Sequence, residues 1–218
     1  MKADVVKKIN ECRLIAALES FPADLTLYTA EALIKGGIKA IAIDLDSSDE
    51  KSERASIQKI AALKQCFGKD VLIGASRVLS DKGVRLIKGA GADFITAPNA
   101  KKSVIERAEL KSLVAIPGAF TPSEIFDAAS FGADFVSLYP SKIGADYSYA
   151  AMMKNTFPEI KLVGAGGLDF NDIAPLFKAG IERYIIGGSL ANKTLAEKKE
   201  YAILTNEAKR YVDFIESL

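Results

Sequence analysis

Two aspartates follow the hydrophobic run Ile41-Ala42-Ile43 and are separated by a single residue. If this run is a β-strand, Asp44 and Asp46 point to the same face of it, because alternate side chains share a face. Such a pair could supply a general base with a partner, or could bind a divalent cation. The polar residues that follow also allow a solvated loop edge. Asp44, directly after the hydrophobic run, is the better placed of the two candidate catalytic residues.

Other polar side chains stand at the ends of further hydrophobic runs. Glu19 follows the first run, and Arg77 follows Gly74-Ala75-Ser76. An arginine facing a cavity would bind a carboxylate or a phosphate, although a surface arginine packing its stem on the rim is an equal alternative. Ser137 and Tyr139 end a later run, and Tyr139 could act as an acid or simply form a wall. We therefore add Arg77, Ser137 and Tyr139 to the candidate catalytic residues.

Two glycine clusters lie late in the chain, Gly164-Ala165-Gly166-Gly167 and Gly187-Gly188-Ser189. Glycine lets backbone N–H groups approach an anion closely, and in α/β barrels the loops after the last two strands commonly hold phosphate. Tight turns that need positive φ are the alternative explanation. The position of both clusters favours binding of a phosphate or carboxylate by Gly166, Gly167, Gly188 and Ser189.

The composition of the 218-residue chain excludes several kinds of site. Histidine is absent, which rules out metal sites, catalytic triads and general bases that depend on an imidazole. A net charge of +1 gives no basic surface for nucleic acid, and no apolar run is long enough for a membrane helix. Cys12 and Cys66 have no metal-ligand spacing, and with no signal peptide we expect a cytoplasmic protein. The expected partner is a small anionic ligand.

Eight short apolar runs alternate with amphipathic stretches along the whole chain. Their nearly continuous Val, Ile and Ala content is typical of parallel strands buried on both faces. We predict one domain over residues 1–218, a (β/α)8 TIM barrel, with a doubly wound open sheet as the alternative. An extra N-terminal helix is expected at 2–10 and a long C-terminal helix at 195–217. The predicted strands are 12–18, 38–44, 70–74, 93–97, 112–116, 134–139, 160–164 and 182–187.

The helix boundaries have their own signals. Ser80, Thr121 and Asp169 are placed to cap the helices that follow them, and Pro122 suits the first helical position. Four glycines precede predicted strands and are suited to end the helices before them: Gly37, Gly91, Gly132 and Gly180. This repeated helix–glycine–strand junction supports an α/β fold.

Six blocks of the chain, taken in order, resemble the 2-keto-3-deoxy-6-phosphogluconate / 4-hydroxy-2-oxoglutarate (KDPG/KHG) aldolase family over about residues 12–195. They are ALIKGGI at 32–38, IGASRVL at 73–79, GADFITAP at 91–98, IPGAFTPSE at 116–124, DFVSLYP at 134–140, and the late glycines within 166–189. The resemblance implies a (β/α)8 barrel, class I aldolase chemistry, a homotrimer and no resident cofactor. It also implies that Pro98 lines the substrate pocket and that Gly118, Gly166, Gly167, Gly188 and Ser189 bind the substrate's phosphate.

The sequence departs from the family pattern at the catalytic positions. The lysine that forms the Schiff base corresponds to Ser137, and the glutamate that moves protons corresponds to Ala42. The family's strand-two arginine falls on Asp46 and its strand-three threonine on Arg77. Serine cannot form an imine, and alanine cannot move protons.

Three hypotheses about function follow. The first is an aldolase-family lyase acting on a small keto acid or phosphorylated sugar acid, with a relocated lysine such as Lys142 or Lys161 or with another mechanism. The second is a different phosphosugar enzyme that uses Asp44, Asp46 and Arg77, with a divalent cation at the two aspartates as an option. The third is a non-catalytic protein that binds a phosphorylated metabolite.

Overall fold

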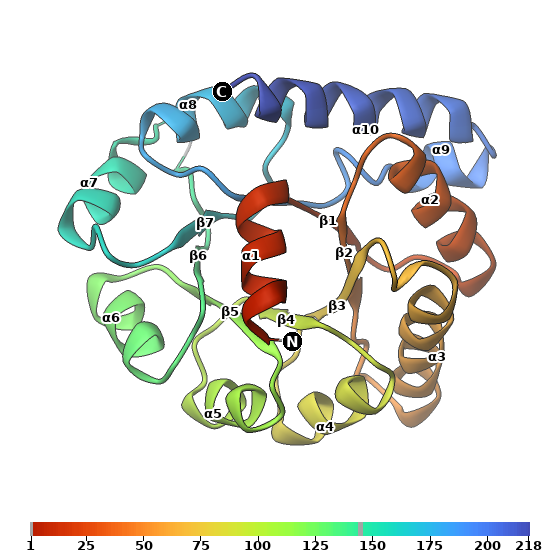
Figure 1. Cartoon of the computed structure of the whole chain (residues 1–218), viewed down its shortest axis with the longest axis horizontal. Coiled ribbons are helices and arrows are strands. Elements are labelled where there is room, and N and C mark those ends of the chain that lie inside the picture. Colours follow the sequence, from red (N-terminus) through yellow and green to blue (C-terminus); the bar gives the residue numbers. More distant parts are fainter. Residues whose placement is uncertain (1, 144–145) are drawn as a thin grey trace.

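Eight parallel strands form a closed barrel in the computed structural model, which describes residues 2–143 and 146–218. The strands follow one another around the barrel in chain order, and β1 pairs with β8 (Figure 1). This pairing confirms the predicted (β/α)8 barrel and excludes the open sheet. The strands are β1 (Leu14–Leu18), β2 (Ala40–Asp44), β3 (Leu72–Ser76), β4 (Phe94–Ala97), β5 (Val114–Ala119), β6 (Val136–Leu138), β7 (Leu162–Gly164) and β8 (Tyr184–Ile186).

Helices surround the barrel as an outer ring, and none of those described is long and apolar enough to cross a membrane. Two predicted caps are present: Ser80 accepts a hydrogen bond from the Gly83 N–H, and Thr121 forms a capping box with Glu124. The ring consists of α2 (Ala23–Lys35), α3 (Glu50–Phe67), α4 (Asp81–Gly89), α5 (Lys102–Leu110), α6 (Pro122–Ser130), α7 (Ser148–Thr156), η1 (Phe170–Asp172), α8 (Ile173–Lys178), α9 (Lys193–Glu197) and α10 (Tyr201–Glu216).

The four glycines expected after helices all have positive φ, from 84° at Gly180 to 99° at Gly37. The left-handed conformation lets the chain leave the helix and enter the next strand at once. Asp169 also caps as expected, but it begins the 3₁₀ turn η1, which leads into α8.

The prediction of one C-terminal helix over 195–217 is wrong. Lys199 adopts a left-handed conformation with φ of 58°, and its N–H bonds to the Ala196 carbonyl, which ends α9. The chain turns there, and α10 packs along α2. Gly36 makes this approach possible, because a Cβ at that position would lie 2.5 Å from the Thr205 carbonyl oxygen.

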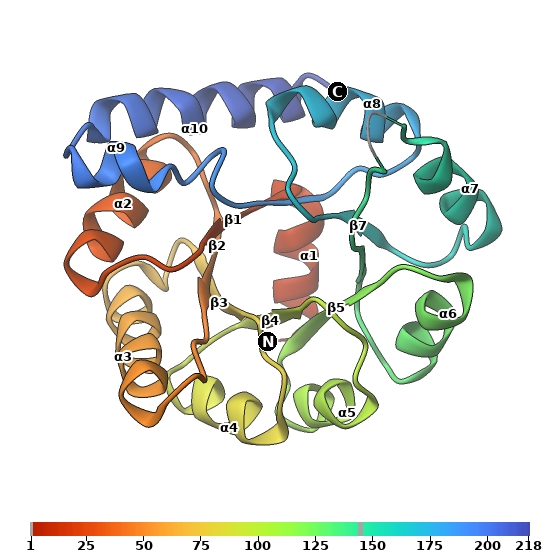
Figure 2. The ribbon, with the colours of Figure 1, turned by 180° about the vertical axis from the view of Figure 1, so that it is seen from behind.

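Helix α1 (Lys2–Cys12) lies across the amino-terminal end of the barrel and closes it (Figures 1 and 2). Its Ile9 is buried against an apolar layer inside the barrel. Alternate residues of the strands form this layer: Ile15, Ala40, Ala42, Leu72, Phe94, Val114, Ile116, Phe135 and Val163. One end of the barrel is therefore sealed, and a ligand can enter only at the carboxyl ends of the strands.

Candidate active site

A cavity of about 360 Å³ opens at the carboxyl ends of the strands. The two-residue period that builds the apolar layer continues outward, so the next inward side chains after Ala42 and Phe94 are those of Asp44 and Thr96. The cavity is lined by Ala17, Glu19, Ser20, Asp44, Ser76, Arg77, Thr96, Ala97, Pro98, Ser137, Tyr139, Ala165, Gly166, Gly167, Ile185 and Gly187. The layers below it are apolar, and its wall carries the polar groups.

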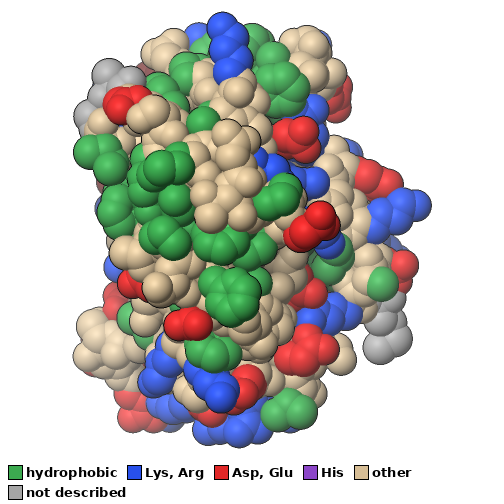
Figure 3. All heavy atoms as spheres, turned by 90° about the vertical axis from the view of Figure 1, so that its left-hand side faces the viewer, with side chains coloured by type: hydrophobic (Ala, Val, Ile, Leu, Met, Phe, Trp, Pro, Cys, Tyr) green, Lys and Arg blue, Asp and Glu red, His purple; other side chains and the backbone are tan. Residues whose placement is uncertain are grey.

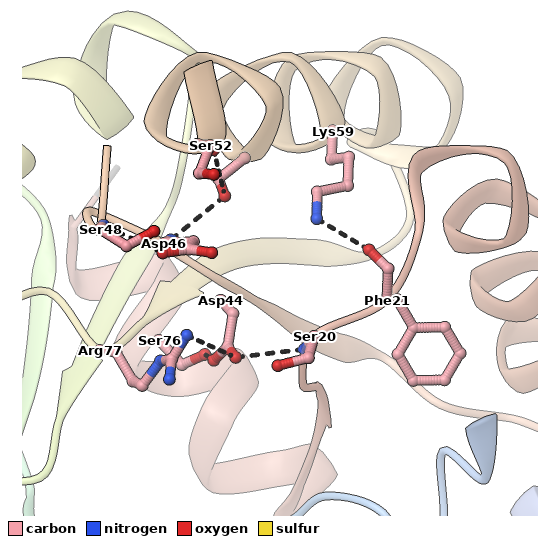
Figure 4. A network of polar contacts seen from close by, with 10 residues as sticks. Ser20, Phe21, Asp44, Asp46, Ser48, Ser52, Lys59, Ser76 and Arg77 are labelled. Atoms are coloured by element: carbon pink, nitrogen blue, oxygen red, sulfur yellow. Dashed lines mark hydrogen bonds and ion pairs between the residues drawn. The ribbon is translucent and has the colours of Figure 1, made fainter. Parts of the chain in front are cut away.

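Asp44 is the central carboxylate of this wall and is 5% exposed. Its Oδ1 accepts a hydrogen bond from the Ser76 hydroxyl at 2.7 Å, and its Oδ2 accepts one from the Ser20 N–H at 3.2 Å (Figure 4). The same Oδ2 lies 3.2 Å from Nη2 of Arg77. These contacts fix the carboxylate at the cavity edge, where it can accept a proton or a ligand hydroxyl.

Glu19 brings a second carboxylate to the cavity from the end of β1. Loss of hydration and the nearby Asp44 charge raise the pKa of Glu19, while Arg77 acts against this shift. Gly187 leaves the room for it, since a Cβ there would lie 2.7 Å from Oε1 of Glu19. Sequence reasoning noted Glu19 only as a residue after a strand. A carboxylate of raised pKa beside a charged partner is suited to exchange protons.

Arg77 is half exposed and stands in a left-handed conformation with φ of 55°. This conformation turns the chain sharply after β3, so the guanidinium lies over Asp44 at the cavity edge. The sequence left two alternatives open for Arg77, and the structure places it among the residues that line the cavity. It can neutralise negative charge on a ligand there.

Asp46 lies apart from Asp44, beyond the end of β2. Its Oδ1 accepts a hydrogen bond from the Ser48 N–H at 3.0 Å, and this contact and the Ser48 side chain hold the pKa of Asp46 below its usual value. Asp46 lines a neighbouring cavity and is not among the described residues that line the main cavity. Among the residues that the structure describes, no three His, Cys, Asp or Glu side chains are grouped to hold a metal.

Ser137, Tyr139 and Pro98 all line the cavity, as the sequence predicts. Ser137 is buried, and its hydroxyl donates to the Pro117 carbonyl at 3.3 Å. Tyr139 is 43% exposed at the mouth. Ala42 lies one layer deeper, in the apolar layer that Phe94 fills, and does not reach the cavity.

The glycines divide between the cavity and its surroundings. Gly166 and Gly167, with φ of 92° and 72°, line the cavity after β7. Gly188 and Ser189 follow Gly187 in a turn after β8, where the Ser189 hydroxyl donates to the Leu168 carbonyl at 2.7 Å. Gly118 has a packing role, since a Cβ there would lie 2.5 Å from the Pro98 carbonyl oxygen. Of the five residues expected to bind phosphate, the structure thus places Gly166 and Gly167 in the cavity lining, whereas Gly118, Gly188 and Ser189 are not among its lining residues.

Neither lysine considered as a replacement nucleophile reaches the cavity. Lys142 binds both carboxylate oxygens of Asp172, at 2.7 and 2.8 Å, and Tyr147 donates to the same carboxylate. Lys161 lies over the Phe135 ring at 5.6 Å, toward the amino-terminal end of the barrel. No lysine is found among the described residues that line the main cavity.

A (β/α)8 barrel whose polar cavity lies at the carboxyl ends of the strands, beside glycine turns after β7 and β8, is typical of barrel proteins that bind small phosphorylated ligands. A family model for KDPG and KHG aldolase matches residues 5–206. The chain therefore belongs to the KDPG/KHG aldolase family.

Individual relatives agree with this assignment. The chain is 31% identical over 179 residues to 2-dehydro-3-deoxy-6-phosphogalactonate aldolase of Escherichia coli (strain K12), covering 81% of this chain and 83% of that one. It is 29% identical over 177 residues to a probable aldolase of the same substrate from Rhizobium meliloti (strain 1021), covering 81% of each. A solved structure described as native KDPGal superposes with a TM-score of 0.80 at 25% identity, covering 94% and 96% of the two chains.

Proposed function

We propose that this protein is a lyase that cleaves a phosphorylated 2-keto-3-deoxy sugar acid without forming an imine on lysine. The observation that carries the proposal is the placement of Asp44, Glu19 and Arg77 around one cavity whose described lining contains no lysine. The names of the relatives supply the substrate class. The second hypothesis, another phosphosugar enzyme, would use the same three residues.

The cavity offers separate partners for the two ends of such a substrate. The backbone N–H groups of Gly166 and Gly167 have no acceptor among the described residues, and their positive φ turns them into a concave surface suited to phosphate. Gly187 also lines the cavity after β8, whereas Gly188 and Ser189 are not among its lining residues. Arg77 stands across the cavity from these turns, beside Asp44, where it can hold the keto acid end.

The cleavage needs a base, a charge stabiliser and an acid. Asp44 or Glu19 takes the proton of the C4 hydroxyl, the C3–C4 bond breaks, and its electrons move to the C2 carbonyl oxygen. Arg77 stabilises the resulting enolate, which returns to pyruvate when C3 gains a proton from the protonated carboxylate. The other product is a phosphorylated aldehyde. The raised pKa of Glu19 suits this exchange.

The first experiment separates cleavage from imine formation. The protein is incubated with 2-keto-3-deoxy-6-phosphogalactonate, and pyruvate is measured with a coupled dehydrogenase, with and without EDTA or magnesium. A second sample receives pyruvate and borohydride and is weighed by intact mass spectrometry beside a lysine-dependent aldolase. Pyruvate release without a mass adduct is the expected result. An adduct on any lysine would refute the imine-free mechanism, and binding without turnover would identify a non-catalytic binder.

We further propose a homotrimer that resides in the cytoplasm. Large apolar side chains are exposed on α6, α7 and the loop between β6 and α7, namely Phe126, Met152, Tyr139 and Ile143, and apolar side chains gather on this face of the molecule (Figure 3). Exposed apolar groups of this kind support contact with further copies of the chain. Both cysteines are free, which agrees with a reducing compartment. Light scattering after size-exclusion chromatography measures the mass, and Phe126→Asp is expected to lower it.

A further inference from the structure

A second cavity, of about 320 Å³, opens beside the first between α3 and the segment that follows β1. It shares Ser20, Asp44 and Arg77 with the main cavity, so the ion pair between Asp44 and Arg77 forms part of a common wall. The rest of its lining is Phe21, Pro22, Ala23, Asp46, Ser52, Ala55, Ser56 and Lys59. The two cavities are therefore neighbours on either side of this ion pair.

Lys59 is the cation that the second cavity does not share with the main one. It extends from α3 toward the segment after β1, and its Nζ donates to the Phe21 carbonyl at 2.9 Å (Figure 4). An ammonium has three N–H donors, and the structure records no second acceptor and no ion pair for Lys59 among the described residues. Burial lowers the pKa of Lys59, and the charges of Asp44 and Asp46 act in the opposite direction.

Four of the other polar side chains of the second cavity already have partners. Asp44 accepts from Ser76 and Ser20 and pairs with Arg77, while Asp46 accepts from the Ser48 N–H. The Ser52 hydroxyl donates to Asp49 and the Ser56 hydroxyl to the Ser52 carbonyl. Lys59 is thus a lining cation with no ion pair and with donors left for an incoming acceptor, and Arg77 has further N–H donors in the shared wall. Two cations beside two aspartates suit a singly charged carboxylate better than a doubly charged phosphate.

We propose that this second cavity is a subsite for the carboxylate of a phosphorylated sugar acid, with Lys59 as its positive partner. The phosphate of the same molecule would lie at Gly166 and Gly167, and the chain of carbons between them would pass Arg77. The proposal rests on the proposed function and deepens it, because it names the residue that would select an acid over the corresponding alcohol.

The test compares two stable ligands that differ only at one end. Isothermal titration measures binding of 6-phosphogluconate, which carries a carboxylate, and of glucitol 6-phosphate, which carries an alcohol there. The natural protein is expected to prefer the acid by about tenfold, the value of one charge-assisted hydrogen bond. Lys59→Met should reduce this preference to near unity, and Lys59→Arg should retain most of it. Lys51→Met, an exposed lysine on the same helix, serves as the matched control.

Each outcome supports or overturns the carboxylate subsite at Lys59. A preference that Lys59→Met leaves unchanged, with a melting curve like that of the natural protein, would overturn the subsite. Equal binding of both ligands by the natural protein would also overturn it, while leaving the phosphate site and the proposed function intact. If neither ligand binds, the subsite is overturned, and pyruvate release from 2-keto-3-deoxy-6-phosphogalactonate decides the proposed function separately.

Discussion

Replacing Asp44 by Asn separates a catalytic role of this carboxylate from a structural one. The amide has almost the same shape, so its oxygen can still accept from the Ser20 N–H, and the Ser76 hydroxyl can rotate to accept from the new NH₂ group. The lost ion pair with Arg77 is half exposed and stabilises the fold by about 0–1 kcal/mol. We therefore expect the free energy of unfolding to fall by only about 1 kcal/mol.

The effect on turnover should be much larger. Loss of a general base slows a reaction by about 10²- to 10⁴-fold, so this variant also distinguishes Asp44 from Glu19 as the group that takes the proton. Pyruvate release from 2-keto-3-deoxy-6-phosphogalactonate measures this rate, and a thermal melt should shift by only about 2–4 °C. The variant should also lower the pKa of Glu19, since the Asp44 charge is one of its causes; carboxyl carbon NMR reads this directly.

The reasoning would be refuted if Asp44→Asn retained a rate within about threefold of that of the natural protein. It would equally be refuted if rate and stability collapsed together, because the carboxylate would then serve the fold. Asp70→Asn is the matched control, since Asp70 is exposed before β3, at the opposite end of the barrel. It should leave both the rate and the melting temperature unchanged.

Three further predictions concern stability. Because folding raises the pKa of Glu19, ionised Glu19 opposes folding. The stability that is present below its ordinary pKa of 4.5 is lost as the pH rises through the pKa of Glu19 in the folded protein. The Glu19→Gln variant should therefore melt at a higher temperature than the natural protein at pH 7, and at no higher a temperature at pH 4. Gly74→Ala would place a Cβ 2.5 Å from ring atoms of the fully buried Phe94, so urea denaturation should show a loss of about 1–3 kcal/mol, with partial recovery in the double variant with Phe94→Leu. Thr121→Ala removes the capping box with Glu124 and should cost about 1 kcal/mol in the same assay, and no loss would contradict the role of the cap.

Local signals in the sequence were sufficient to predict the order of the helices and strands. Each strand was predicted within three residues of its observed ends because buried parallel strands are apolar throughout, and the helix ends followed from residues such as Thr121 and Gly132. The break at Lys199 could not be predicted in the same way. A lysine in a left-handed conformation has no local sequence signal, and the turn there depends on the packing of α10 against α2.

Contacts between residues far apart in the sequence determine which side chains form the candidate site. Asp44 and Arg77 could be placed at the cavity because Asp44 is the last residue of β2 and Arg77 directly follows β3. Glu19 gained its importance from the pairing of β1 with β8, which brings Gly187 beside it. Lys142 follows β6 in the sequence, which suggests a position near the rim of the cavity. Its ammonium is instead bound by Asp172, thirty residues further along the chain. Contacts across such separations cannot be derived from either segment alone.

The layers inside the barrel explain why the departures from the family pattern belong together. Ala42 lies in the sealed apolar layer with Phe94 and Ile116, where an unpaired carboxylate would lose its hydration without gaining a partner. The position two residues later on the same face of β2 is Asp44, which opens onto the cavity and has three partners. The β2 carboxylate thus lies one layer further outward than the family pattern expects. A carboxylate there reaches a ligand at the rim, next to Arg77, as the proposed proton transfer requires.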